Sequence, residues 1–211
     1  MVKNISIFVT LKTNYNSILI ITNMTKTEIL ERLKAGNEQF VKDNLSHNNI
    51  DKSARKELVN GQNPFAIVLS CADSRVIPEL IFDTGLGELF VLRVAGNIAN
   101  TSTIASIEYS VAHLNTEMIV VLGHQACGAV TAAVNGGDNG YNLNHLLAHI
   151  VPAMEATADN ATVDDVIHKN AELTVKELTK RSGILSDAVN SGKLQIVPAY
   201  YHLDSGKVDF L

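Results

Sequence analysis

The sequence has little that would bind nucleic acid or cross a membrane. Its 211 residues carry 17 lysines and arginines against 22 aspartates and glutamates, a net charge of −5, so no basic surface favours a phosphate backbone. No apolar run reaches the roughly 18 residues that a membrane-spanning helix needs. Cysteine occurs twice, which allows at most one disulfide, and tryptophan is absent. We expect a protein with neither nucleic-acid nor membrane partners.

The chain has the composition of an ordinary globular protein. Apolar residues make up 46% and charged residues 18%. A chain of this length builds one sizeable core, whereas two independent cores would be cramped. We therefore expect a single domain over residues 24–211.

The first 23 residues resemble a signal peptide only superficially. Polar residues, Lys12 and Asn14 among them, interrupt the apolar part, and no small-x-small cleavage site follows it. Thr25 and Glu28 have the spacing of a capping box at the start of a helix. We predict that residues 1–23 are a weakly ordered extension, that Met24 is a possible natural start, and that the protein is cytoplasmic.

Hydrophobic patterns alternate along the chain between short continuous runs and helical periodicity. Runs over 65–69, 88–94 and 118–122 indicate strands buried on both faces. The last residues, 193–211, read as two strands joined by the turn "DSG". Helices are expected over 27–42, 52–60, 101–114, 128–135, 143–157, 162–179 and 184–191. The order predicts an α/β fold: a mostly parallel central sheet with flanking helices, C-terminal edge strands and an N-terminal helical arm. The arm, 27–42, is expected to pack on a neighbouring subunit.

Both cysteines and one histidine follow predicted strands. In "LSCADSRVIPEL" Cys71 comes directly after the first strand, and in "LGHQACGAV" His124 and Cys127 follow the third. The carboxyl ends of parallel strands meet at one edge of a sheet. Two thiolates and one imidazole suit Zn²⁺, and three protein ligands leave a fourth position open, as in catalytic zinc sites. Two buried structural thiols, or a redox pair of Cys71 with Cys127, remain alternatives.

Asp73 and Arg75 lie beside the first cysteine. A carboxylate there could be a fourth ligand or could orient a bound water, with the guanidinium holding it. The plainer interpretations are a helix N-cap for Asp73 and a surface ion pair for Arg75. The pair His145 and His149, four residues apart in "HLLAH", lacks the glutamate of zinc proteases, so a second metal site is not expected.

Cys-x-Asp-Ser-Arg followed by His-x-x-Cys-Gly resembles the β-class carbonic anhydrase family. The similarity extends from "TEILERLKAGNEQF" through "LFVLRVAGN" and "SIEYSVAHL" to the terminal "GKVDFL", nearly all of the chain after Thr25. The resemblance implies reversible hydration of CO₂ to bicarbonate by a zinc-bound hydroxide. It also implies a homodimer or homotetramer.

The resemblance assigns roles to individual residues. Cys71, His124 and Cys127 match the zinc ligands, with Asp73 a possible fourth ligand in a closed state, and Asp73 and Arg75 match the carboxylate and guanidinium dyad. Further matches are Gln62, which would donate a hydrogen bond to substrate oxygen, and the substrate-pocket residues Phe90, Ala95, Tyr109 and Gly128.

The sequence departs from some members of the family at an inhibitory site. Some bacterial members have an inhibitory bicarbonate site that needs a tryptophan at the position of Val68, and Arg93 alone cannot complete that site. We therefore expect the zinc to keep an open water position at neutral pH. A related CS₂ or COS hydrolase and a non-catalytic zinc-stabilised domain are the alternative functions. Asp73, Arg75 and Gln62 argue against the second, because a structural zinc needs no residues that orient water.

Overall fold

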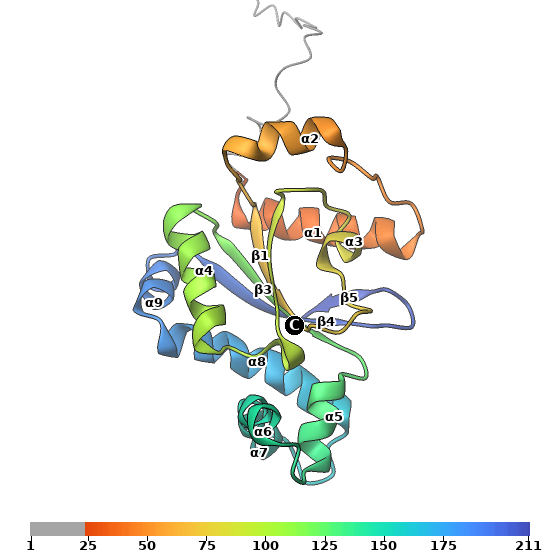
Figure 1. Cartoon of the computed structure of the whole chain (residues 1–211), viewed down its shortest axis with the longest axis vertical. Helices are drawn as coiled ribbons and strands as arrows, with labels where there is room; N and C mark the ends of the chain where they lie inside the picture. Colours follow the sequence, from red (N-terminus) through yellow and green to blue (C-terminus); the bar gives the residue numbers. More distant parts are fainter. Residues whose placement is uncertain (1–23) are drawn as a thin grey trace, which may run out of the picture.

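The computed structural model describes residues 24–211, which contain a central five-stranded sheet (Figure 1). The strands lie in the order β2-β1-β3-β4-β5. All neighbouring pairs are parallel except β4 and β5, which are antiparallel. The strands are β1 (Ala66–Ser70), β2 (Leu89–Arg93), β3 (Met118–His124), β4 (Gln195–Tyr201) and β5 (Val208–Phe210). The predicted α/β class with a C-terminal edge strand is confirmed.

The two central strands owe their position to uninterrupted apolar sequence. Every residue of β1 and β3 is buried, because helices cover both faces of the sheet. The edge strand β2 is only half-buried along most of its length. The sheet therefore has a sealed centre and one more accessible edge.

Helices cover the sheet in two layers (Figure 1). Apolar side chains of α1 and α3 join one core cluster with alternate residues of β1 and β3, and those of α4, α8 and α9 join another on the opposite face. The bounds of these helices are α1 (Lys26–Val41), α3 (Pro78–Ile81), α4 (Thr101–His113), α8 (Val163–Arg181) and α9 (Gly183–Asn190).

The N-terminal helix α1 contributes to its own chain's core, and its expected contact with a neighbouring subunit stays a prediction. Thr25 and Glu28 form the predicted capping box. Leu33 is fully buried against the sheet. The buried Asn37 donates from Nδ2 to the carbonyl oxygens of Ile81 and Gly206 and accepts from the backbone N–H of Val208 at 2.8 Å. Those bonds fasten α1 to α3 and to the β4–β5 hairpin.

The predicted helix over 143–157 is in fact two helices, α6 (Tyr141–Leu147) and α7 (Val151–Glu155). Pro152 cannot donate a backbone hydrogen bond and stands in the first turn of α7, where proline is tolerated. The predicted helix over 52–60 is α2 (Lys52–Glu57) followed by a 3₁₀ turn, Leu58–Asn60. None of the helices in the described part of the chain has the length and apolar character to span a bilayer.

Candidate metal centre

Three metal-binding side chains meet at the carboxyl edge of the sheet. Cys71 directly follows β1, His124 is the last residue of β3, and Cys127 stands at the N-cap of α5 (Gly128–Asn135). Their ligand atoms lie within 4.8 Å of one another and all three residues are buried. The sequence prediction that the first and third core strands bring these residues together is confirmed. Among the described residues they form the one such group of three or more.

The loop between His124 and Cys127 is shaped by backbone contacts. Ala126 has a positive φ of 53°, which turns the chain sharply so that Cys127 faces back toward His124. The N–H of Gln125 donates to the carbonyl of Tyr201 at 2.9 Å. The Gln125 side chain contacts Asp204 in the β4–β5 turn. The neighbouring hairpin thus supports the ligand loop.

The imidazole of His124 is arranged as a metal ligand would be. Its Nδ1 lies 2.9 Å from the carbonyl oxygen of Gln125, a contact that requires the proton on Nδ1 and leaves a lone pair on Nε2. Nε2 is buried and has no hydrogen-bond partner. An unpaired buried nitrogen costs free energy unless something binds it. The residues therefore fit a metal ion.

The two thiols are close but not bonded. Cys71 Sγ and Cys127 Sγ lie 4.0 Å apart and both cysteines are free. Hydrogen bonding from the Cys127 thiol lowers the pKa of Cys71, with the Gly96 N–H contributing. The hydrogen bond to Cys71 and burial raise the pKa of Cys127. One thiolate thus forms readily, and a cation would be needed to stabilise both.

Asp73 and Arg75 form a forked ion pair beside the cluster. Arg75 donates from Nε to Asp73 Oδ1 at 2.9 Å and from Nη2 to Oδ2 at 2.8 Å, and its backbone N–H reaches Oδ1 as well. These bonds hold the pKa of Asp73 well below its usual range. Asp73 Oδ2 lies 4.0 Å from His124 Nε2. Asp73 caps no helix, so the N-cap interpretation is wrong, and the functional role of the pair stays a prediction.

Arg93 holds the backbone of the same loop. It donates from Nε to the carbonyl oxygen of Cys71 at 3.1 Å and from Nη2 to that of Asp73 at 2.6 Å. Sequence reasoning linked Arg93 only to an inhibitory site. Its contacts from the end of β2 follow from the parallel pairing of Ser70 with Arg93, which no motif reveals.

Two predicted pocket residues lie near the metal cluster. Ala95 follows β2 and is half-buried, and Gly128 opens α5 directly after Cys127. Between Ala95 and the cluster, Gly96 donates its N–H to Cys71 Sγ at 3.4 Å. Gly96 has a φ of 69°, and a Cβ at that position would come within 2.9 Å of Ile150 Cδ1. A backbone donor of this kind leaves no signal in the sequence beyond the glycine itself.

The other three predicted site residues are not near the cluster within one chain. Gln62 precedes β1, whose five residues separate it from Cys71 by about 16 Å of strand. Phe90 pairs with Ile67 in the register, about 13 Å before Cys71. Its ring lies 6.4 Å from that of Tyr109. Within one chain, Gln62, Phe90 and Tyr109 are therefore separate from the metal cluster.

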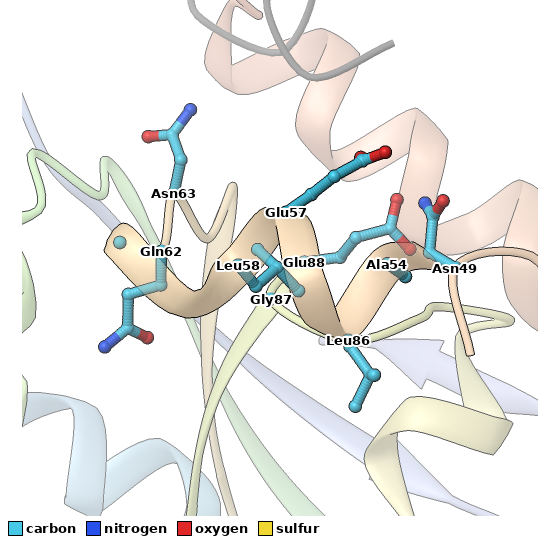
Figure 2. A pocket seen from close by; sticks show the side chains of 10 residues that line it. Asn49, Ala54, Glu57, Leu58, Gln62, Asn63, Leu86, Gly87 and Glu88 are labelled. Atoms are coloured by element: carbon cyan, nitrogen blue, oxygen red, sulfur yellow. The ribbon is translucent and has the colours of Figure 1, made fainter. Parts of the chain in front are cut away.

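Gln62 instead belongs to a hollow at the amino end of the sheet. Figure 2 shows its side chain leaving the end of the α2 segment in the direction opposite to that of Asn63. The hollow measures about 320 Å³ and lies beside an open groove that Gln62 and Tyr109 line together. Large apolar side chains that line the groove are exposed: Val59, Leu86 and Tyr109.

Four other histidines lie outside the metal cluster. His145 and His149 lie on one helical face with ring centroids 5.7 Å apart, and they belong to no group of three potential ligands among residues 24–211. His168 stacks on Tyr200 at 4.0 Å, and His202 bonds Asp209 at 2.8 Å.

Comparison with known proteins agrees with this site. The family profile described as "Carbonic anhydrase" matches residues 66–208. Carbonic anhydrase 2 of Mycobacterium tuberculosis is 40% identical over 182 residues, covering 83% of this chain and 87% of the relative. The carbonic anhydrase of Mycolicibacterium smegmatis is 36% identical over 183 residues, covering 84% and 89%.

Solved structures with a similar fold are also carbonic anhydrases. The β-carbonic anhydrase CcaA superposes with a TM-score of 0.70 at 26% identity, covering 86% of this chain and 98% of the other. A structure described among two tetrameric β-carbonic anhydrases of Sordaria macrospora gives a TM-score of 0.67 at 27% identity, covering 74% and 85%.

Proposed function

The chain belongs to the β-class carbonic anhydrase family and catalyses the reversible hydration of CO₂ to bicarbonate and a proton, and we propose that Cys71, His124 and Cys127 hold the zinc ion for this reaction. The buried, unpaired Nε2 of His124 between two thiols carries the proposal. The relatives are named carbonic anhydrases, which favours neither a CS₂ or COS hydrolase nor a non-catalytic zinc domain.

The ligand set suits zinc and leaves room for chemistry. Two thiolates and one imidazole are ligands that zinc prefers, and three protein ligands are typical of catalytic sites. When bound, zinc would supply Lewis acidity that makes water a nucleophile near neutral pH. The hydrogen bond from the Gly96 N–H to Cys71 Sγ reduces the charge that this thiolate donates.

Asp73 is the residue that orients the nucleophile. Its carboxylate stays ionised because Arg75 binds both oxygens, so it can accept a hydrogen bond at any pH near neutrality. Its distance of 4.0 Å from His124 Nε2 places it beside the ligands and outside direct contact. Because both Asp73 oxygens are bonded to Arg75, this pairing would compete with binding of Asp73 to the metal, which favours an open site. Ala95 lends the site an apolar wall, which suits CO₂ because that molecule has little polarity.

We further propose that the active site is completed by a second copy of the chain, in a homodimer or homotetramer. Gln62, Phe90 and Tyr109 lie together at the amino end of the sheet, too far from their own metal cluster to act there. Tyr109 is 50% and Val59 78% exposed, which is unusual for large apolar side chains without a partner. In a twofold dimer, the groove of one protomer can face the cluster of the other. Gln62 would then donate to bicarbonate oxygen as charge develops.

We assign the protein to the cytoplasm. Both cysteines are free thiols in the structure, and a reducing compartment keeps them available as metal ligands.

Stopped-flow CO₂ hydration by the zinc-loaded protein, across about pH 7 to 9.5, tests the function directly. We expect turnover to rise with pH, because thiolate ligands make the bound water less acidic than three histidines would. Metal analysis of the same sample should give one zinc per chain. A zinc-loaded protein without hydration activity at any of these pH values would contradict the function.

A further inference from the structure

A second cavity lies between α7 and α8. It measures about 270 Å³. Its apolar walls come from Ala99, Pro152, Ala153 and Leu173, and the buried polar residues Asn170 and Thr174 line it as well. The role of the metal cluster in hydration uses none of these residues. A pocket that is mostly apolar with a few polar groups is the usual form of a small-molecule site.

The mouth of this cavity is positively charged. Lys176 and Lys180 line it together with Glu177, and Arg181 donates from Nη1 to the carbonyl oxygen of Ala99. Three cations therefore surround one carboxylate, on a chain whose net charge is −5. Glu177 is already paired with Lys180 at 3.3 Å and Arg181 is bonded to Ala99, so Lys176 is the cation that stays available for an anion.

His149 completes the mouth as a neutral group. Burial, followed by the nearby charge of Arg181, lowers its pKa. Near pH 7 it therefore adds a hydrogen-bonding ring and no charge. The charges at the mouth therefore favour a ligand that has a single anionic group at one end.

The inner wall of the cavity contacts the loop that holds the metal cluster. Asn170 is 2% exposed, and its Nδ2 donates to the carbonyl oxygen of Gly96 at 2.8 Å. The N–H of the same Gly96 donates to Cys71 Sγ. One residue thus stands between the cavity and a metal-ligating sulfur.

We propose that this cavity binds a small monocarboxylate with an apolar body, such as an aromatic acid, and that its occupancy alters the Gly96–Cys71 contact. The walls take the apolar body and the lysines take the carboxylate. The binding part stands by itself, whereas any effect on hydration rests on the proposed function of the cluster.

Isothermal titration calorimetry of the zinc-loaded protein with benzoate tests the binding. We expect a dissociation constant of about 1 mM or tighter, as ligand efficiencies allow for so small a molecule. Benzyl alcohol, which has the same ring and no charge, should bind at least about 10-fold more weakly. Excess azide, which competes for metal, should leave the benzoate isotherm unchanged.

Two kinds of variant locate the site. Thr174→Leu, which fills the cavity, should abolish binding, and Lys176→Met with Lys180→Met should weaken it about 10-fold. Lys34→Met, an exposed lysine on α1, is the matched control and should leave binding unchanged. If Thr174→Leu does not fold, the double variant Lys176→Met, Lys180→Met still tests whether benzoate binds at this site.

The Gly96 amide resonance reports the coupling without any enzyme assay. In ¹H–¹⁵N spectra it should shift on benzoate addition in the native protein and stay in place in the filled variant. Absence of binding, binding that azide abolishes, or binding indifferent to the lysine and threonine replacements would overturn the proposal. An inactive enzyme that still binds benzoate in this way would contradict the proposed function alone.

Discussion

The two ends of the sheet differ in how complete they are. At the carboxyl end, one chain buries Cys71, His124 and Cys127 within 4.8 Å of one another, with Asp73 and Arg75 beside them. At the amino end, Gln62 and Tyr109 line an open groove with exposed apolar side chains. The carboxyl end needs a metal ion to bind its unpaired ligand atoms. The amino end needs a protein surface to bury its exposed apolar side chains. In the proposed assembly, the metal centre is ordered within one chain and the substrate-binding residues come from another.

Removing one of the proposed metal ligands at the carboxyl end should have the largest effect on turnover. His124→Ala should lose zinc and reduce turnover at least about 1,000-fold, because two thiols alone do not form a closed ligand set. His145→Ala, from the histidine pair outside the cluster, should keep its zinc and its turnover. Metal analysis and stopped-flow hydration of the two variants make the comparison. Retention of zinc by His124→Ala would contradict the ligand assignment.

Asp73→Asn separates metal binding from catalysis at the same end. The amide keeps the size of the side chain but loses the charge that pairs with Arg75. We expect one zinc per chain and turnover reduced about 100-fold, within the range of a lost acid–base or orienting group. Asp138→Asn, in an exposed loop, serves as the control. Near-normal turnover would show that Asp73 does not orient the nucleophile.

A mixed dimer tests whether the two ends belong to one site. We expect Gln62→Leu alone to lower turnover about 10-fold or more, through loss of a donor to developing charge. When Asp73→Asn and Gln62→Leu subunits are co-expressed with different tags and purified as a heterodimer, one site carries both changes and the other neither. About half of the wild-type turnover per dimer should return. Activity no higher than the average of the two parents would mean that each chain uses its own Gln62.

The smallest expected effect concerns Tyr200, a buried residue at the carboxyl end of the sheet, and the pH dependence of the free energy of unfolding. Burial and the hydrogen bond from Tyr200 Oη to Asp164 raise the pKa of Tyr200. Because the folded pKa exceeds the unfolded value near 10, this stabilisation is fully present below that pH and is lost as pH rises above it. By pH 10.5 the loss should reach about 0.8 kcal/mol.

Urea unfolding at pH 8 and 10.5 measures this difference. Tyr200→Phe should be less stable at pH 8 by about 1 kcal/mol, the value of one hydrogen bond, and should lose correspondingly less between the two pH values. Tyr141→Phe, at an 86% exposed position, should behave as the wild type. An equal pH slope in all three proteins would contradict the role of Tyr200.

The sequence predicted the carboxyl end well because its signals are local. Strand runs end at Cys71 and His124, and parallel strands must end at the same edge. The amino end was predicted only as a set of residues, because the location of Gln62 relative to the cluster depends on strand direction and on a partner surface. The roles of Gly96 and Arg93 arise from backbone hydrogen bonds that have no residue pattern. The split of the helix over 143–157 was signalled by Pro152, whose effect the periodicity analysis overlooked.

The bonds of Asn37 bear on how the protein is made. Its amide joins residues 169 and 171 positions later in the chain, so α1 leaves the ribosome long before Gly206 and Val208 exist. At ordinary synthesis rates the helix waits about 10 to 30 s for these partners. During that interval the apolar side chains of α1 that later enter the core are accessible to chaperones, and α1 is fastened only when Gly206 and Val208 have been translated.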